Sequence, residues 1–202
     1  MNKVLIDLCG KPVIWYCLDR FERSKVEEII LVTSKSDLDA MCKIVRENRF
    51  SKVKEIIIGG TTRQESVYNG LRHATGEFVC VHDGARALLS SEDLENVLYD
   101  AEKYGAAALG SKTIDTLKLT DNDGFIIKTI DRESMVNIAT PQVFKTNELI
   151  KAHEKFKNES VTDDCALMEK LGKKIKVTIA TNTNIKLTTP TDLQIAKAYI
   201  AD

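Results

Sequence analysis

VEEIILVTSKSDLDAMCKIVRENRFSKVKEIIIGG, residues 26–60, decides the fold class. Residues 26–34 form a continuous run rich in β-branched side chains, which is typical of a strand buried on both faces. Residues 36–48 repeat apolar side chains at helical spacing behind a Ser/Asp cap, and residues 53–60 form a second strand that ends in two glycines. This succession predicts a βαβ unit, with parallel strands and a right-handed crossover.

The same alternation continues on both sides of this stretch. A first helix is expected at Pro12, because proline is tolerated in the first helical turn and apolar residues follow it at helical spacing. Further helices are expected over 62–74, 90–104, 145–157, 162–171 and 189–201, and further strands over 77–85, 106–112 and 176–181. The sequence therefore predicts a single α/β domain over residues 1–202, with a mostly parallel sheet flanked by helices.

The alternation of strands and helices is interrupted at residues 116–132, TLKLTDNDGFIIKTIDR. Two alternating segments flank Asn122-Asp123-Gly124, which is a hairpin signal because Gly124 can take a positive φ without steric cost. An isolated hairpin is only marginally stable in water. We therefore expect this inserted hairpin to pack on another surface, for which a partner subunit is the natural candidate.

The net charge and the apolar content of the chain indicate which kinds of partner it does not bind. The 202 residues are 43% hydrophobic and carry a formal net charge of −1. The chain therefore has no overall positive charge that would attract nucleic acid or acidic membranes. The longest apolar runs fall well short of the roughly 20 residues of a membrane span, and no signal or transit peptide pattern is present. These features predict a cytoplasmic protein that binds neither nucleic acid nor membrane.

The five cysteines include no C-x-x-C pair, which favours reduced thiols packed as small apolar residues. Cys80 and His82 alternate along one expected strand and could in principle share a metal. Two ligands without a third are a weak signal, so a core thiol beside a structural imidazole is the favoured interpretation.

Polar and glycine residues gather at the expected strand ends, where open parallel sheets bind ligands. After the second strand come Gly59 and Gly60, which allow close backbone approach to a ring or a phosphate, and then Arg63 and Ser66 at the start of a helix. A plain glycine turn is the alternative interpretation of this segment.

The third strand ends in Asp83, Gly84 and Arg86, a carboxylate and a guanidinium that could hold a divalent cation and a phosphate. A structural Asp–Arg pair is the alternative. Lys186 precedes the last helix at the same edge and could face an anionic ligand or lie at the surface.

Five segments, in this order and with these intervals between them, resemble the sugar- and polyol-phosphate cytidylyltransferases, above all the 2-C-methyl-D-erythritol 4-phosphate cytidylyltransferase family. They are VHDGAR (81–86), the pair IDR (130–132) and ATPQ (139–142), VTDDCALMEKLG (161–172) and NIKLTTPTDL (184–193). The resemblance runs from Lys3 to the C-terminus. It implies a Rossmann-like nucleotidyltransferase fold that joins CTP to a polyol phosphate, with Mg²⁺, and releases pyrophosphate.

The resemblance also implies roles for individual residues. The catalytic cations would be Lys3, Arg132 and Lys186, and Asp83 is the candidate metal ligand. The hairpin resembles the family's dimerisation arm, so Arg132 would act in the partner's site of a homodimer. The nucleotide would be bound by Gly59, Gly60, Arg63, Ser66, Asp83 and Gly84, and the acceptor by Asp83, Arg86, Thr116, Arg132, Thr140 and Lys186.

The beginning of the sequence departs from the family pattern. The family opens with a strand and a glycine-rich loop that carries an arginine, whereas here only Lys3 matches, by its spacing to GKPVI. Without the strand, an inner position of the sheet is expected to be empty and its neighbours to have exposed edges. Three interpretations compete: part of a longer active enzyme, a truncated dimerising or binding module with impaired catalysis, or a sheet completed by another chain.

The acceptor also has an alternative. Ribitol-5-phosphate cytidylyltransferases of teichoic acid synthesis share the fold and most of these motifs. Ala87 stands where the methylerythritol phosphate family often has proline. The choice between methylerythritol phosphate, used in the non-mevalonate route to isoprenoid precursors, and ribitol phosphate therefore stays open on sequence alone.

Overall fold

The computed structural model describes residues 2–181 and 183–201. The helices are α1 (Val13–Glu22), α2 (Leu38–Asn48), α3 (Arg63–Leu71), α4 (Ser91–Tyr104), α5 (Thr146–Lys155), α6 (Asp164–Lys170) and α7 (Pro190–Ala201). The strands are β1 (Asp7–Leu8), β2 (Lys11–Pro12), β3 (Ile29–Thr33), β4 (Val53–Ile58), β5 (Phe78–Val81), β6 (Ala106–Lys112), β7 (Lys118–Thr120), β8 (Ile126–Thr129), β9 (Val136–Lys145) and β10 (Lys176–Ile179). Within these residues, no helix is both long and apolar enough to cross a membrane.

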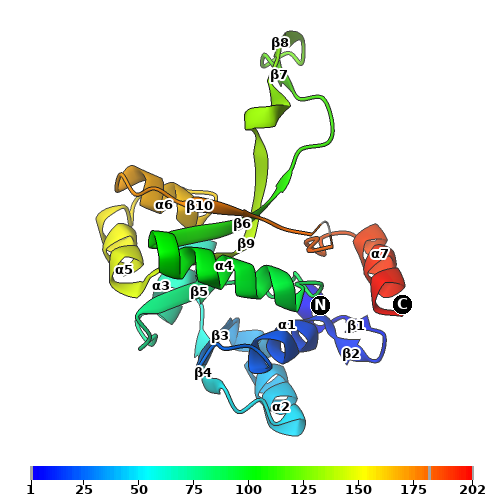
Figure 1. The fold of residues 1–202 in the computed structure, drawn as a ribbon. Helices are drawn as coiled ribbons and strands as arrows, with labels where there is room; N and C mark the ends of the chain where they lie inside the picture. The colour runs from blue at the N-terminus through cyan, green and yellow to red at the C-terminus, as the bar shows by residue number, and fades with distance from the viewer. Residues whose placement is uncertain (1, 182, 202) are drawn as a thin grey trace.

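The central sheet has the strand order β10-β6-β9-β5, with helices on both of its faces (Figure 1). The side chains of β6 alternate between the two layers, as the two-residue period of a strand requires. Ala107 and Leu109 pack in the cluster that contains α4, whereas Ala106 and Ala108 pack in the cluster that contains α5 and α6. The predicted α/β class with flanking helices is confirmed.

The central sheet is mixed because of β9, a strand that was not among the predicted ones. β9 runs antiparallel to both β5 and β6, so the expected mostly parallel sheet has an antiparallel strand at its centre. Pro141 lies in the middle of β9 and argues against a central strand, because it cannot donate to the ladder. The β6 pairing shifts register between Ala108 and Gly110, opposite the segment that contains Pro141, and this irregularity accommodates the proline.

β3 and β4 form a second, parallel pair, packed against α1 and α2. The expected first helix begins at Val13, directly after Pro12, and the apolar residues that define its pattern are buried. Several expected strands are shorter than their sequence pattern: β3 begins only at Ile29, and β5 ends at Val81. The βαβ unit that decides the fold class is therefore confirmed.

A cavity of about 1180 Å³ separates this pair from the central sheet, and its walls include all of β3 and β5. Among the described residues, β3 pairs only with β4, and β5 pairs only with β9. Each strand therefore turns a free edge toward the cavity. The expected exposed strand edges are therefore those of β3 and β5.

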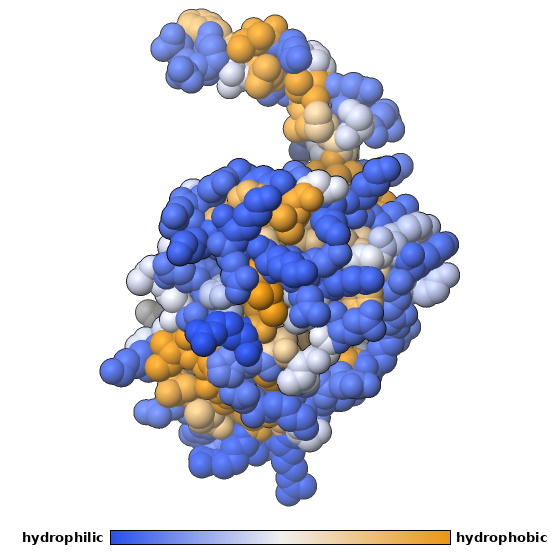
Figure 2. Space-filling view, turned by 90° about the vertical axis from the view of Figure 1, so that its left-hand side faces the viewer, coloured by the Kyte–Doolittle hydropathy of each residue, from blue (hydrophilic) through white to orange (hydrophobic). Residues whose placement is uncertain are grey.

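The expected hairpin is formed by β7 and β8, and it projects away from the rest of the chain (Figure 1). Its turn contains Gly124 at φ +88°, a left-handed conformation that favours glycine. Apolar side chains are exposed on the projecting arm, where Figure 2 shows orange atoms among blue and white ones above the body. The exposed ones include Leu119, Phe125, Ile126 and Ile127.

Candidate active site

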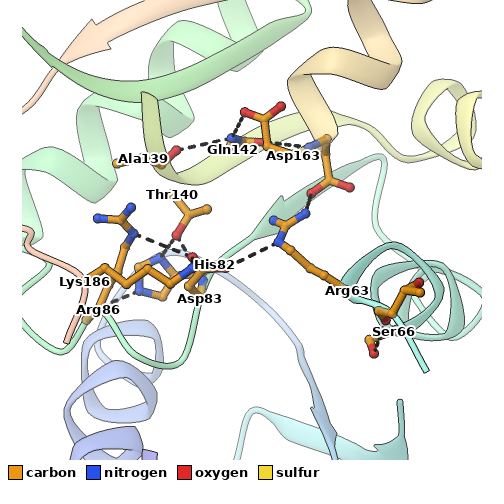
Figure 3. Close-up of polar contacts among 12 residues, drawn as sticks. Arg63, Ser66, His82, Asp83, Arg86, Ala139, Thr140, Gln142, Asp163 and Lys186 are labelled. Carbon is orange, nitrogen blue, oxygen red and sulfur yellow. Dashed lines mark hydrogen bonds and ion pairs between the residues drawn. The ribbon is translucent and has the colours of Figure 1, made fainter. Parts of the chain in front are cut away.

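Asp83 lies at the centre of a cluster of cationic side chains just beyond the end of β5 (Figure 3). Its Oδ2 atom is 2.8 Å from Lys186 Nζ and 3.8 Å from Arg86 Nε. Its Oδ1 atom is 3.6 Å from Arg63 Nε. Arg63 also pairs with Asp164, so three cations meet two carboxylates, and the remaining positive charge favours an anionic ligand.

The Asp83 carboxylate is stabilised in its charged form. Burial alone would raise its pKa, but the hydrogen bond and charge of Lys186, with the charges of Arg63 and Arg86, outweigh burial and hold the pKa below its usual range. Asp83 is therefore ionised at neutral pH and balances part of the cationic charge around it.

Hydrogen bonds from two other segments fix the backbone around Asp83. The Asp83 N–H donates to Thr140 Oγ1 at 3.0 Å, and Thr140, which is only 4% exposed, comes from β9. Asn184 donates from Nδ2 to the Thr140 carbonyl at 2.8 Å, and Arg86 donates from Nη1 to the Asn184 carbonyl at 2.8 Å. These contacts tie the loop after β5 to β9 and to the segment that carries Lys186.

The six residues predicted to bind the nucleotide all line the 1180 Å³ cavity: Gly59, Gly60, Arg63, Ser66, Asp83 and Gly84. Thr62 caps α3 by accepting a hydrogen bond from the Glu65 N–H, and Ser66 Oγ accepts one from the Gly60 N–H at 3.1 Å. A Cβ atom on Gly60 would come within 2.2 Å of the Glu65 Cβ, so this close approach of loop and helix requires glycine. The structure thus brings the predicted nucleotide residues together.

A second cavity of about 200 Å³ lies at Arg86, and it is also lined by Ser111, Asn137 and Asn184. Arg86 Nε is buried and has no hydrogen-bond partner within the described part of the chain. A guanidinium with an unused donor beside amide and hydroxyl groups suits an oxygen-rich ligand. Arg86 lines the smaller cavity and Asp83 lines the larger one, and the two side chains are 3.8 Å apart. The two cavities therefore approach each other at this pair.

Three predicted residues lie apart from this cluster. Thr116 and Arg132 belong to the projecting arm, where Arg132 donates to the Ile114 carbonyl at 2.6 Å. Lys3 is exposed, in a short 3-10 turn over Lys3–Leu5, and makes no ion pair with any residue that the structure describes. Its neighbour Val4 lies close to Gly84, so the turn borders the site.

His82 and Cys80 behave as structural residues. Burial lowers the pKa of His82 to about 4, so its imidazole is neutral at pH 7, and burial raises the pKa of the Cys80 thiol to about 12. His82 contacts Thr140 Oγ1 and the Arg86 carbonyl, each at 3.3 Å. Within residues 2–181 and 183–201, no group of three or more His, Cys, Asp or Glu side chains is arranged to hold a metal.

Three residues behind Arg63, namely Asp164, His153 and Gln142, were not among the predicted site residues. Arg63 Nη1 lies 2.9 Å from Asp164 Oδ2, and Asp164 Oδ1 lies 3.0 Å from His153 Nε2. Gln142 Oε1 accepts hydrogen bonds from the Asp164 and Cys165 N–H groups. The available signal was the pair Asp163-Asp164 at the start of a helical pattern, where a capping residue is expected.

Comparison with known proteins matches the whole chain, residues 1–202, to the family model for 2-C-methyl-D-erythritol 4-phosphate cytidylyltransferase. A curated relative of that name from Clostridium acetobutylicum is 41% identical, over 98% of this chain and 89% of the relative. One from Clostridium perfringens strain SM101 is 40% identical, over 99% of this chain and 91% of the relative.

Solved structures agree with this match. The structure of 4-diphosphocytidyl-2C-methyl-D-erythritol synthase from Anaerococcus prevotii superposes with a TM-score of 0.90 at 33% identity, covering 98% of this chain and 89% of that one. The Thermus thermophilus 2-C-methyl-D-erythritol 4-phosphate cytidylyltransferase superposes with a TM-score of 0.82 at 27% identity, covering 99% and 94%. The resemblance carried by the five sequence segments is confirmed, and the chain belongs to the 2-C-methyl-D-erythritol 4-phosphate cytidylyltransferase family.

Proposed function

We propose that this protein transfers CMP from CTP to 2-C-methyl-D-erythritol 4-phosphate and releases pyrophosphate. The observation that carries this proposal is Asp83 among Lys186, Arg63 and Arg86, at the approach of two cavities. The part of the larger cavity that is lined by Gly59, Gly60 and Asp83 suits the nucleotide, and the smaller cavity suits the acceptor. Family membership supports the same assignment.

The proposed chemistry needs positioning and charge neutralisation more than a proton acceptor. An oxygen of the acceptor phosphate attacks the α-phosphorus of CTP, and the bond from that phosphorus to the bridging oxygen breaks, so pyrophosphate leaves with the electron pair. Because the nucleophile is already an anion, no general base is required, in agreement with the buried His82, whose lowered pKa makes it a weak proton acceptor. Cations aimed at the phosphates stabilise the transition state.

On the nucleotide side, Gly59, Gly60 and Gly84 would let the cytosine and ribose approach the backbone, with Ser66 beside them. Arg63 would meet the triphosphate, since it faces the same cavity and is 35% exposed. Lys3 would add a further cation at the border of the cavity.

On the acceptor side, Arg86 and Lys186 would hold the phosphate between them. Lys186 is 41% exposed although it pairs with Asp83, so it can contact a ligand. Thr140 would act through Asp83, because its hydroxyl already accepts the Asp83 N–H. This arrangement would place the attacking oxygen at the edge of the nucleotide cavity.

The residues present would bind a divalent cation such as Mg²⁺ only if the substrate supplied further oxygen ligands. Mg²⁺ commonly binds through one or two carboxylates plus substrate phosphates. Asp83 is the carboxylate at this site, so Asp83 and the nucleotide phosphates would share the ion, which would neutralise phosphate charge.

We also propose that the arm formed by β7 and β8 joins two copies of the chain, so that Thr116 and Arg132 serve the partner's site. The exposed apolar side chains of the arm support this, because burying them on a partner is favourable. Arg132 is half-exposed and contacts arm residues rather than the Asp83 cluster of its own chain.

The direct test is pyrophosphate release from CTP, measured with methylerythritol phosphate and with ribitol 5-phosphate as acceptors. We expect release with methylerythritol phosphate, abolished in Asp83→Asn and retained in Asp39→Asn, a matched change at an exposed position of α2. Preference for ribitol phosphate would overturn the acceptor. Absence of CTP-dependent release with both acceptors would overturn the reaction and favour a dimerising or binding module.

A further inference from the structure

Arg63 joins two carboxylates that come from different parts of the fold. Toward the cavity its Nε faces Asp83 at 3.6 Å, and on the other side its Nη1 contacts Asp164 at 2.9 Å. The guanidinium is therefore held from behind while one edge stays open to the nucleotide cavity (Figure 3).

Asp164 is itself immobilised in the interior. The side chains of Asp164 and His153 are each 1% exposed, and the Asp164 carboxylate uses one oxygen for His153 and the other for Arg63. The His153 ring stacks on Tyr68 of α3 at 6.0 Å between ring centroids. Burying such a polar group is unfavourable unless its partners are well placed, and apolar residues could fill the same space.

Gln142 links this buried pair to the part of β9 that fixes Asp83. Its Oε1 accepts from the N–H groups of Asp164 and Cys165, and its Nε2 donates to Asp163 Oδ2 at 2.9 Å. Two residues earlier in β9, Thr140 accepts the Asp83 N–H. One strand segment therefore sets the position of both carboxylates that Arg63 contacts.

We propose that Asp164, oriented by His153 and Gln142, is a positioning residue that presents the Arg63 guanidinium to the phosphates of the nucleotide. The raised pKa of Arg63 agrees with this: burial alone would lower it, but the charge and hydrogen bond of Asp164, with the charges of Asp83 and Asp163, outweigh burial. The inference rests on the proposed cytidylyltransferase function, since it assigns Arg63 to CTP. Asp164 does not contact the substrate but acts through Arg63.

The position of Arg63 can be observed without turnover, by NMR of the arginine Nε–Hε groups. The Arg63→Lys variant assigns the resonance by its loss. We expect Asp164→Asn to shift or broaden that resonance, because the guanidinium loses its charged partner. Asp100→Asn is the matched control: Asp100 accepts a hydrogen bond from Thr178 on the far side of the sheet, so this change should leave the resonance in place.

A double-mutant cycle on kcat/KM for CTP tests the functional link. We expect Asp164→Asn to lower this constant by about 10-fold to 100-fold, as a small misplacement of a catalytic-site group does. Arg63→Lys should lower it at least as much, because lysine cannot reproduce the guanidinium fork. In the double variant the losses should not multiply, because Asp164 has no effect once Arg63 is absent.

Two results would overturn the proposal: an Arg63 resonance unchanged in Asp164→Asn, or losses that multiply in the double variant. If Asp164 had a merely structural role, Asp164→Asn would lower the melting temperature, and its loss of kcat/KM would multiply with the loss caused by Arg63→Lys. If the unaltered protein shows no CTP turnover, the proposed function fails, whereas the resonance comparison still decides whether Asp164 positions Arg63.

Discussion

The Nζ atom of Lys186 lies 2.8 Å from the Oδ2 atom of Asp83, although one residue precedes the last helix and the other follows β5. The pair is only partly covered, because 41% of the lysine side chain is exposed against 18% of the aspartate side chain. Asp83 therefore orients Lys186 while leaving its ammonium group open to an incoming phosphate.

Lys186→Met should reduce pyrophosphate release by about 10²–10³-fold, the usual cost of losing one preorganised charge contact at a transition state. Lys186→Arg should retain more activity, because the positive charge remains. Lys173→Met is a suitable control, since Lys173 pairs with Glu148 on the surface beyond α6. A loss of pyrophosphate release below about threefold in Lys186→Met would contradict a role of Lys186 in stabilising the transition state.

Thr140→Ala should lower the free energy of unfolding by about 1–3 kcal/mol, because the Asp83 N–H loses its buried acceptor. Thr140→Ser keeps the hydroxyl and should lose clearly less. Urea unfolding of the three proteins measures the difference. Equal losses in the alanine and serine variants would assign the effect to the methyl group and contradict the role of the hydrogen bond.

The sequence predicted the strand-end cluster because such an inference needs only local patterns. Gly59, Gly60 and Asp83 directly follow strand patterns, and the ends of neighbouring strands in such sheets meet at one edge. Gly124 and the hairpin were predictable for the same reason, since two alternating segments flank a glycine turn.

The residues behind Arg63 were not predictable from the same patterns. Asp164 and His153 meet through the packing of α6 on α5, and no spacing in the sequence specifies that contact. β9 was missed because Pro141 contradicts a central strand locally, whereas pairing with β5 and β6 overrides this preference. Prediction from the sequence is therefore limited by tertiary packing. Local patterns show on which helix or strand a side chain lies, but they do not show how the helices and strands pack on each other.

The stability of the protein should fall between about pH 6.5 and pH 4 because of His82. Burial lowers its folded-state pKa to about 4, so below its unfolded pKa of about 6.5 only the unfolded chain takes up the proton. The stabilising contribution is complete above pH 6.5 and is lost as the pH falls, by about 2 kcal/mol between pH 7 and pH 5.

Urea unfolding across this pH range should therefore show a smaller slope in His82→Asn. His73→Gln serves as the control, because His73 is exposed beside Glu55. The Asp83 carboxyl does not interfere above pH 4.5, because its pKa is held below the usual value of 3.8 and its contribution is lost only at lower pH. An unchanged slope in His82→Asn would contradict a buried neutral imidazole.

Mixing two inactive variants tests whether Arg132 works in the partner's site. Arg132→Met and Lys186→Met should each lower release by about 10²–10³-fold alone. Their mixture should regain about a quarter of the unaltered activity, because half of the dimers are mixed and each contains one intact site. If Arg132 served its own chain, no combination would restore a site. Adding Phe125→Asp to both variants should prevent the recovery, since a charge at this exposed apolar position would oppose burial of the arm on a partner.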